Sequence, residues 1–214
     1  MLARFASRSS LALIVFLLVA CAACGGEALA QERAPGAILL LAKPELADPN
    51  FRHSVVLVTR AAEGQTLGVI LNRPSDIEPA SILPRGATSD NYDDAVYFGG
   101  PVMPDVAVAL FRSASTPPAS LPVLDGVYLT MNPDNVAALL DDEDAEYRLY
   151  AGFSAWARGQ LEREIALGSW YVLPADEDTV LREDTAGLWE ELIERASAKK
   201  ASMTRTLAAR QLNP

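Results

Sequence analysis

Cysteine and histidine are scarce in this sequence of 214 residues, and their scarcity excludes several kinds of site. There are two cysteines, Cys21 and Cys24, and one histidine, His53. Because both cysteines lie near the N-terminus, the rest of the chain can form neither a disulfide nor a thiolate metal site. A lone histidine could hold a metal ion only with carboxylate help. We therefore predict no metal, no cofactor and a fold that depends on its hydrophobic core.

Basic residues are outnumbered by acidic ones, which bears on the possible partners. Lys and Arg together number 18, and Asp and Glu number 28, giving a formal net charge of −10 at pH 7. A chain of this charge repels phosphate backbones, so nucleic acid is not expected among its partners. Hydrophobic residues make up 50% of the chain, which excludes disorder and is enough to fill a real core.

Long hydrophobic runs are also missing. The run at residues 11–20 has about half of the roughly 20 residues that a membrane-spanning helix needs. It follows Arg4 and Arg8, and a short apolar run behind basic residues is typical of an export signal. Residues 1–30 are therefore predicted to direct export, which places the protein in the periplasm or on a membrane of a bacterium.

Two cleavage sites compete within this signal. Residues 18–21, Leu-Val-Ala-Cys, resemble a bacterial lipobox, in which Cys21 is acylated and anchors the protein to a membrane. Residues 28–30, Ala-Leu-Ala, form a small-x-small site that would release a protein beginning at Gln31. The sequence leaves both sites open, and either one keeps residues 31–36 as a tether.

The pattern between residues 37 and 197 predicts one α+β domain. Apolar, β-branched segments come first, helical spacing comes later, and βαβ alternation is absent. Strands are predicted at residues 37–42, 54–59, 66–71, 95–98, 106–112, 127–130, 147–151 and 170–173, and helices at 132–140, 159–167 and 188–196. Residues 198–214 contain four basic and no acidic residues and form a basic C-terminal tail.

Four sequence blocks then point to a family. They read AKPELADPNFRHSVV at residues 42–56, LGVILNRP at 67–74, YFGGPV at 97–102 and GFSAWARGQLE at 152–162, with Trp170 following. In this order they resemble the signature blocks of the bacterial YqgE/AlgH family. The resemblance implies an α+β domain in which a bent, partly barrel-like sheet, mixed or antiparallel, is flanked by a few helices. It implies no settled activity, although some members are named as transcriptional regulators.

The chain departs from the family pattern in two ways. Ala155 and Arg158 stand where the fourth block of the family usually has Gly and Pro, in what we expect to be a loop entering a helix. Family members are also typically cytoplasmic, whereas this chain has a predicted export signal. A periplasmic protein does not meet the chromosome, so export argues against a regulator of transcription.

Glycines, prolines and polar residues of the last three blocks form a candidate binding pocket. Gly and Pro at strand ends are costly unless a specific backbone geometry needs them, so we expect the blocks to converge in space. The candidate residues are Asn72, Arg73, Pro74, Gly99, Gly100, Pro101, Ser154, Trp156 and Gln160.

These residues also have structural interpretations. Gly99 and Gly100 could bring backbone amides to an anion, but a tight turn beneath a packed side chain is the stronger interpretation. Asn72 could satisfy loop amides while Arg73 pairs with an acid, or both could recognise a carboxylate or a peptide backbone. Trp156 could line a cleft, or it could be a core residue that plugs the start of the following helix.

No catalytic residue is predicted. His53 adjoins Ser54, but neighbours on a strand point to opposite faces and cannot act together. The acidic run at residues 141–144 lacks the Gly and Glu positions of a calcium loop.

Three hypotheses for function follow from these observations. The first is a non-enzymatic interaction or regulatory module in the cell envelope, with a protein or small-molecule partner. The alternatives are a transcriptional regulator, by family naming, and a hydrolase-like enzyme that uses the region of Asn72, Gly100 and Trp156. An open cleft with a polar floor would favour the enzyme, and a closed apolar junction would favour the module.

Overall fold

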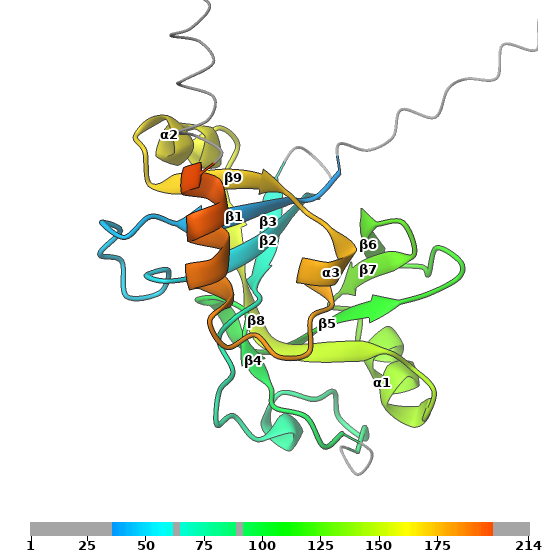
Figure 1. Ribbon diagram of the computed structural model, residues 1–214. Helices are drawn as coiled ribbons and strands as arrows, with labels where there is room; N and C mark the ends of the chain where they lie inside the picture. The colour runs from blue at the N-terminus through cyan, green and yellow to red at the C-terminus, as the bar shows by residue number, and fades with distance from the viewer. Residues whose placement is uncertain (1–35, 62–64, 89–91, 199–214) are drawn as a thin grey trace, which may run out of the picture. The chain divides into compact units, whose positions relative to one another are not determined.

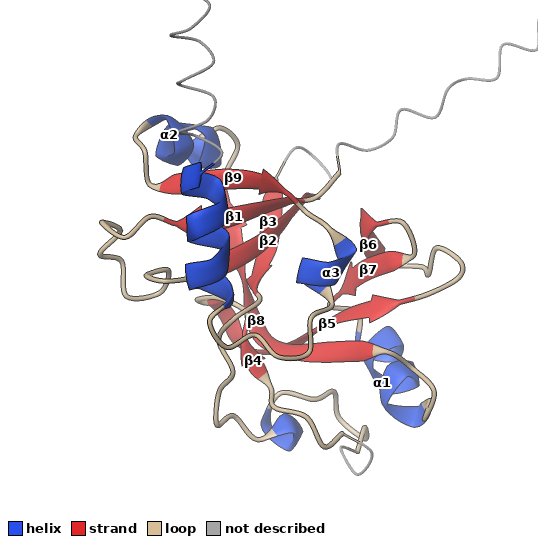
Figure 2. Ribbon diagram, viewed as in Figure 1, coloured by secondary structure: helices blue, strands red, loops and turns tan. Residues whose placement is uncertain are grey.

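The computed structural model describes residues 36–61, 65–88 and 92–198, which belong to one compact unit. Within these residues, nine strands form a single sheet (Figures 1 and 2). The strands are β1 (Ile38–Ala42), β2 (Val55–Arg60), β3 (Thr66–Ile70), β4 (Tyr97–Phe98), β5 (Val102–Arg112), β6 (Ser120–Leu124), β7 (Val127–Thr130), β8 (Tyr147–Trp156) and β9 (Trp170–Pro174). The helices are α1 (Pro133–Asp141), α2 (Gln160–Ala166), α3 (Glu177–Val180) and one at residues 188–198.

Strand β8 explains why the sheet is bent. The strand order is β6-β7-β5-β8-β3-β2-β1-β9, with every neighbouring pair antiparallel, and β4 pairs with β8 in parallel. Residues 147–153 of β8 pair with β5, whereas residues 154–156 pair with β3. Because one long strand changes partners along its length, the sheet curls into a half-barrel (Figure 1). The predicted α+β fold with a bent, partly barrel-like sheet is confirmed.

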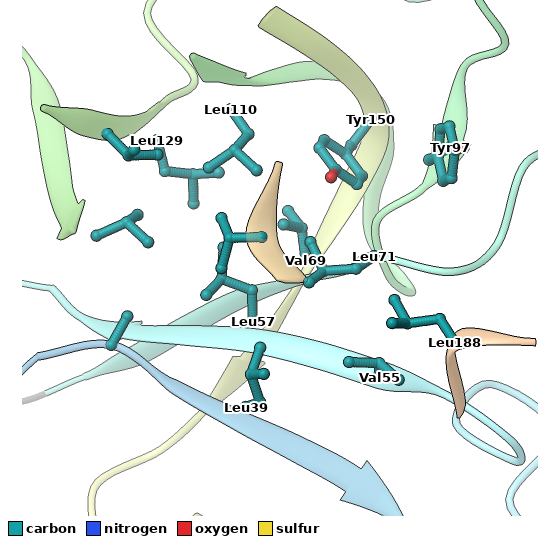
Figure 3. Close-up of a cluster of buried hydrophobic side chains, with 14 of the residues drawn as sticks. Leu39, Val55, Leu57, Val69, Leu71, Tyr97, Leu110, Leu129, Tyr150 and Leu188 are labelled. Carbon is teal, nitrogen blue, oxygen red and sulfur yellow. The ribbon is translucent and has the colours of Figure 1, made fainter. Parts of the chain in front are cut away.

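Both faces of the β1–β3 region are covered, which explains its unbroken apolar runs. Leu39 packs inside the half-barrel in the same cluster as Leu188 of the helix at 188–198 (Figure 3). Leu40 points to the opposite face, into a second cluster that contains Trp156 and Trp170. A strand that is buried on both faces needs apolar residues throughout rather than at alternate positions.

Four details of the sequence-based assignment are wrong. Strand β5 begins at Val102, and β8 continues to Trp156, so Ala155 lies in a strand and not in a loop entering a helix. Strand β6 and the single-turn helix α3 were not predicted. Pro122 argues against a central strand, but β6 is an edge strand, where a missing N–H is tolerated.

Several predictions concern residues outside the described ranges. They are the export signal at 1–30 with its candidate lipid site Cys21, most of the tether at 31–36, and the basic tail apart from residue 198. Within the described ranges, none of the helices combines the length and the apolar character that a bilayer crossing requires.

Tyr150 gives the domain a predicted sensitivity to alkaline pH. Its side chain is fully buried, its hydroxyl makes no hydrogen bond of good geometry with the described residues, and burial raises the pKa of Tyr150 to about 12. A tyrosine in the unfolded chain has a pKa near 10. Between pH 10 and 12 the unfolded state therefore loses the proton first, and the free energy of unfolding falls by roughly 2–3 kcal/mol.

Urea unfolding at pH 8, 10 and 11 tests this expectation. The midpoint should change little from pH 8 to 10 and fall at pH 11. Burial also raises the pKa of Tyr92, so the variant Tyr150→Phe should show a smaller fall rather than none. If the urea midpoint fell equally in the wild type and in Tyr150→Phe, the loss of stability at alkaline pH would not come from Tyr150.

Candidate functional site

The four sequence blocks meet in space, as predicted. Pro74 forms an isolated bridge with Tyr97, which joins the second block to the third. Gly99, in the third block, links the second and fourth blocks, because its carbonyl accepts hydrogen bonds from Ile70 N at 3.1 Å and from Ser154 Oγ at 3.2 Å. Blocks that are separated by up to about a hundred residues in sequence thus share one junction.

Asn72 and Arg73 fix the first block to this junction. The Asn72 side chain accepts a hydrogen bond from Val55 N at 2.8 Å, and it donates one to His53 O at 2.9 Å. Arg73 donates to the carbonyls of Asn50 and Arg52, at 2.5 and 3.1 Å. Asn72 therefore satisfies backbone groups as predicted, although they are one strand amide and one turn carbonyl and not loop amides, and Arg73 pairs with backbone carbonyls of its own chain and not with an acid.

Gly99 and Gly100 are required by close packing. A Cβ at Gly100 would lie 2.4 Å from both the Phe153 carbonyl carbon and Ser154 Oγ, and the φ of Gly100 is +152°. A Cβ at Gly99 would lie 2.2 Å from Gly152 O. Ser154 is fully buried, and its hydroxyl donates to Gly99 O at 3.2 Å. The predicted need for glycine is confirmed, but it comes from the close approach of the β8 backbone and not from a tight turn, and the Ser154 hydroxyl is closed off from solvent.

A cleft of about 440 Å³ lies on the outer side of this junction. The loop between β1 and β2, the end of β8, helix α2 and the start of β9 line it. Phe51, Trp156 and Trp170 form an aromatic cluster there, with Phe51 centred 5.9 Å from the Trp156 ring and 5.6 Å from the Trp170 ring. Trp156 and Trp170 are almost fully buried, so they act as the floor of the cleft.

Glu164 organises the polar side of the cleft. Its Oε2 accepts hydrogen bonds from the indole N–H groups of Trp156 and Trp170, each at 3.0 Å. Its Oε1 accepts from Gln160 Nε2 at 3.0 Å, while Gln160 Oε1 accepts from Ala157 N at 3.2 Å. One carboxylate therefore holds two indoles and an amide, and hydrogen bonds to a charged acceptor are among the stronger ones in proteins.

The nine candidate residues separate into three groups. Pro101, Trp156 and Gln160 line the cleft. Asn72, Arg73 and Pro74 lie behind the loop that forms one wall, and Gly99, Gly100 and Ser154 are packed beneath.

Sequence reasoning missed Glu164 and Phe51 as members of the site. The spacing of Gln160 and Glu164, four residues apart on one helix, was the available signal, because such side chains are neighbours.

His53 and Ser54 do not form a catalytic pair, although the reason differs from the predicted one. His53 lies in a turn before β2 with a φ of +54°, not on a strand, and its ring is centred 4.4 Å from that of Trp189. Ser54 is fully buried and donates to Phe51 O at 2.6 Å. In the part of the chain that the structure describes, no three His, Cys, Asp or Glu side chains are grouped to hold a metal ion.

A larger hollow of about 710 Å³ lies between β5 and α1, away from the four blocks. Arg112 is the cation at its edge, and it is already ion-paired with Glu146 and Glu177. The smaller cleft is the better candidate site, because its floor and walls come from the segments that converge.

Comparisons with known proteins agree with this architecture. The chain matches the AlgH-like family over residues 39–201. A UPF0301 protein of Mycobacterium avium is 37% identical over 174 residues, which are 78% of this chain and 85% of that protein. A UPF0301 protein of Thermobifida fusca is 36% identical over 173 residues, 76% of this chain and 87% of that one.

Two solved structures share the fold. A crystal structure of a Corynebacterium diphtheriae protein has a TM-score of 0.57 at 27% identity, covering 77% of this chain and 87% of that chain. The solution structure of the AlgH protein from Pseudomonas aeruginosa has a TM-score of 0.58 at 26% identity, covering 70% and 81%. The chain belongs to the AlgH-like family, as its four sequence blocks predicted.

Proposed function

We propose that this protein is a non-enzymatic binding module of the cell envelope, and that its ligand or partner group binds in the cleft over Trp156 and Trp170. The observation that carries the proposal is that three of the four blocks line this one cleft while the second block packs behind its wall. Concave sites with aromatic walls and a few fixed polar groups are the usual places for ligands in proteins.

The polar groups of the cleft favour binding over catalysis. The two carboxylate oxygens of Glu164 accept three hydrogen bonds from the protein. Gln160 is hydrogen-bonded through both its amide oxygen and its amide nitrogen. A general acid or base needs free access to the proton that it transfers. Ser154, the hydroxyl nearest to the junction in the fourth block, is buried beneath Gly100.

The location in the envelope is proposed from the N-terminal sequence. A basic start and a ten-residue apolar run precede both candidate cleavage sites. Export also separates the protein from the chromosome, and the net charge of −10 opposes binding to phosphate backbones.

Site-specific photo-crosslinking in the native bacterium tests the proposal. A photoreactive side chain replaces Ala155 at the cleft, or Ala186, which precedes the helix at 188–198, as a matched exposed alanine that lines neither the cleft nor the larger hollow. We expect a defined crosslinked product from position 155 and none from position 186. Equal labelling at both positions, or none at 155, would contradict a partner in the cleft.

Mass spectrometry of the same preparation reports the N-terminus. An exported protein begins with acylated Cys21 or with Gln31. A chain that still begins near Met1 and remains in the cytoplasm would contradict the envelope location, independently of the crosslinking result.

A further inference from the structure

We propose that the cleft binds an organic cation, an alkylammonium or guanidinium group on an aliphatic stem. This inference rests on the proposed function of the cleft as a binding site and specifies the chemistry of its ligand. It follows from an inventory of the donors, acceptors and charges that line the cleft.

The hydrogen-bond donors of the cleft floor are already used by the protein. The indole N–H groups of Trp156 and Trp170 both point to Glu164, at 3.0 Å. The amide N–H of Gln160 donates to the same carboxylate, also at 3.0 Å. An indole has a single donor, so neither tryptophan can offer a second one to a ligand. The other side-chain donors of the lining, the Asn50 amide, the second N–H of the Gln160 amide and the Ser169 hydroxyl, are neutral, so a carboxylate or phosphate meets no positive charge among the residues that line the cleft.

Acceptors remain, and they are negatively charged. A carboxylate can accept about four hydrogen bonds, and Glu164 receives three from the protein. Asp48, on the opposite wall, is exposed and receives one from Asn50 N at 2.8 Å. Among the described residues that line the cleft there is no Lys, Arg or His. Arg73 lies behind the wall, where it donates to backbone carbonyls and attracts the Asp48 carboxylate, so it offsets part of that charge from outside the cleft.

The apolar surface of the cleft suits the stem of such a ligand. Leu46 and Phe51 come from the loop between β1 and β2, and the two indoles form the floor. Aromatic rings attract cations as well as burying methylene groups. A primary amine or guanidinium on a chain of four or five carbons combines both properties, and it is the chemistry of free amines and of Lys or Arg side chains.

NMR of the full mature chain tests the inference with three probes of five carbons each. Pentylamine, 1-pentanol and pentanoate carry a positive, neutral and negative head group respectively, and in pentanoate the fifth carbon belongs to the carboxylate. The chain has three tryptophans, so it gives three indole N–H signals, and Trp189, which donates to Ala42 O outside the cleft, serves as the internal reference. We expect pentylamine to shift the Trp156 and Trp170 signals but not that of Trp189, with an affinity that weakens as salt is added.

A charge-removing pair of variants supplies the control. Asp48→Asn keeps an acceptor for Asn50 N and should weaken pentylamine binding by about two- to fivefold, as for an exposed charge pair. Glu162→Gln removes the same charge from the exposed side of α2, outside the cleft, and should leave the affinity unchanged. An acetylated and amidated Gly-Lys-Gly-Gly peptide, whose only charge is on the lysine side chain, is compared with pentylamine and distinguishes a polypeptide side chain from a free amine as the source of the cation.

The outcomes separate this inference from the proposed function. Tighter binding of pentanoate or pentanol than of pentylamine would overturn the cation, while leaving a binding cleft in place. If no probe shifts the two indole signals, the cation is refuted, and the crosslinking result at Ala155 still decides whether the cleft binds a partner. Equal weakening by Asp48→Asn and Glu162→Gln would show a general charge effect and would also refute the site.

Discussion

Replacing Gly100 with alanine is expected to cost about 3 kcal/mol or more of the free energy of unfolding. The new Cβ would lie 2.4 Å from the Phe153 carbonyl carbon, which is backbone and cannot rotate away. The φ of +152° adds conformational strain for any residue other than glycine. Since domains of this size are stable by about 5–15 kcal/mol, this single methyl group removes a large part of the total.

Urea unfolding followed by circular dichroism measures this effect, with Gly36→Ala as the matched control. No atom lies within 4 Å of a Cβ built at Gly36, so its replacement should change the stability by less than about 0.5 kcal/mol. Equal unfolding midpoints for the two variants would show that the backbone at the junction of the third and fourth blocks can move enough to accept a Cβ. In that case the close packing of Gly100 against β8 would not be required for folding.

Replacing Glu164 with leucine is expected to lower the stability by roughly 2–4 kcal/mol. Leucine is somewhat larger than glutamate and accepts no hydrogen bond, so the two indole N–H groups would lose their shared acceptor. Trp156 and Trp170 are almost fully buried, and water cannot readily replace the carboxylate. The tryptophan fluorescence of the folded variant should also change, because the surroundings of two of the three indoles are altered.

Glu162→Leu on the same helix separates this effect from a change in charge or in helix propensity. Glu162 is exposed, so its loss should alter the stability by less than about 0.5 kcal/mol. The stability of Glu164→Gln should lie between those of the two leucine variants. Its amide oxygen can still accept the hydrogen bonds from the indoles, but its NH₂ group would face the NH₂ group of Gln160, and two donors cannot bond to each other. A Glu164→Leu variant as stable as Glu162→Leu would contradict the role assigned to this carboxylate.

Most strands could be predicted because their apolar runs are buried on both faces. The runs at 38–42, 55–60 and 66–70 lie between the interior of the half-barrel and the second cluster beneath α2, and this produces a signal that a single sequence displays. Helix α1 was predictable for a local reason: the Asn132 side chain accepts hydrogen bonds from Asp134 N and Asn135 N at its first turn. The full length of β8 was not, since Ala155 and Trp156 extend the strand only because β3 lies beside them.

The sequence by itself determined the family, the α+β class, the scarcity of sulfur and imidazole ligands, and the expectation that four blocks converge. These properties depend on composition and on short-range pattern, which are present in the chain before it folds. Only the tertiary structure decided what each residue of the junction does. Arg73 donates hydrogen bonds to backbone carbonyls, and Ser154 is buried beneath Gly100. Glu164 accepts hydrogen bonds from two indoles that belong to two different strands. These hydrogen-bond partners come from different strands, loops and helices, and they meet only because the curled sheet brings those segments together. Residue spacing along the chain does not contain that geometry.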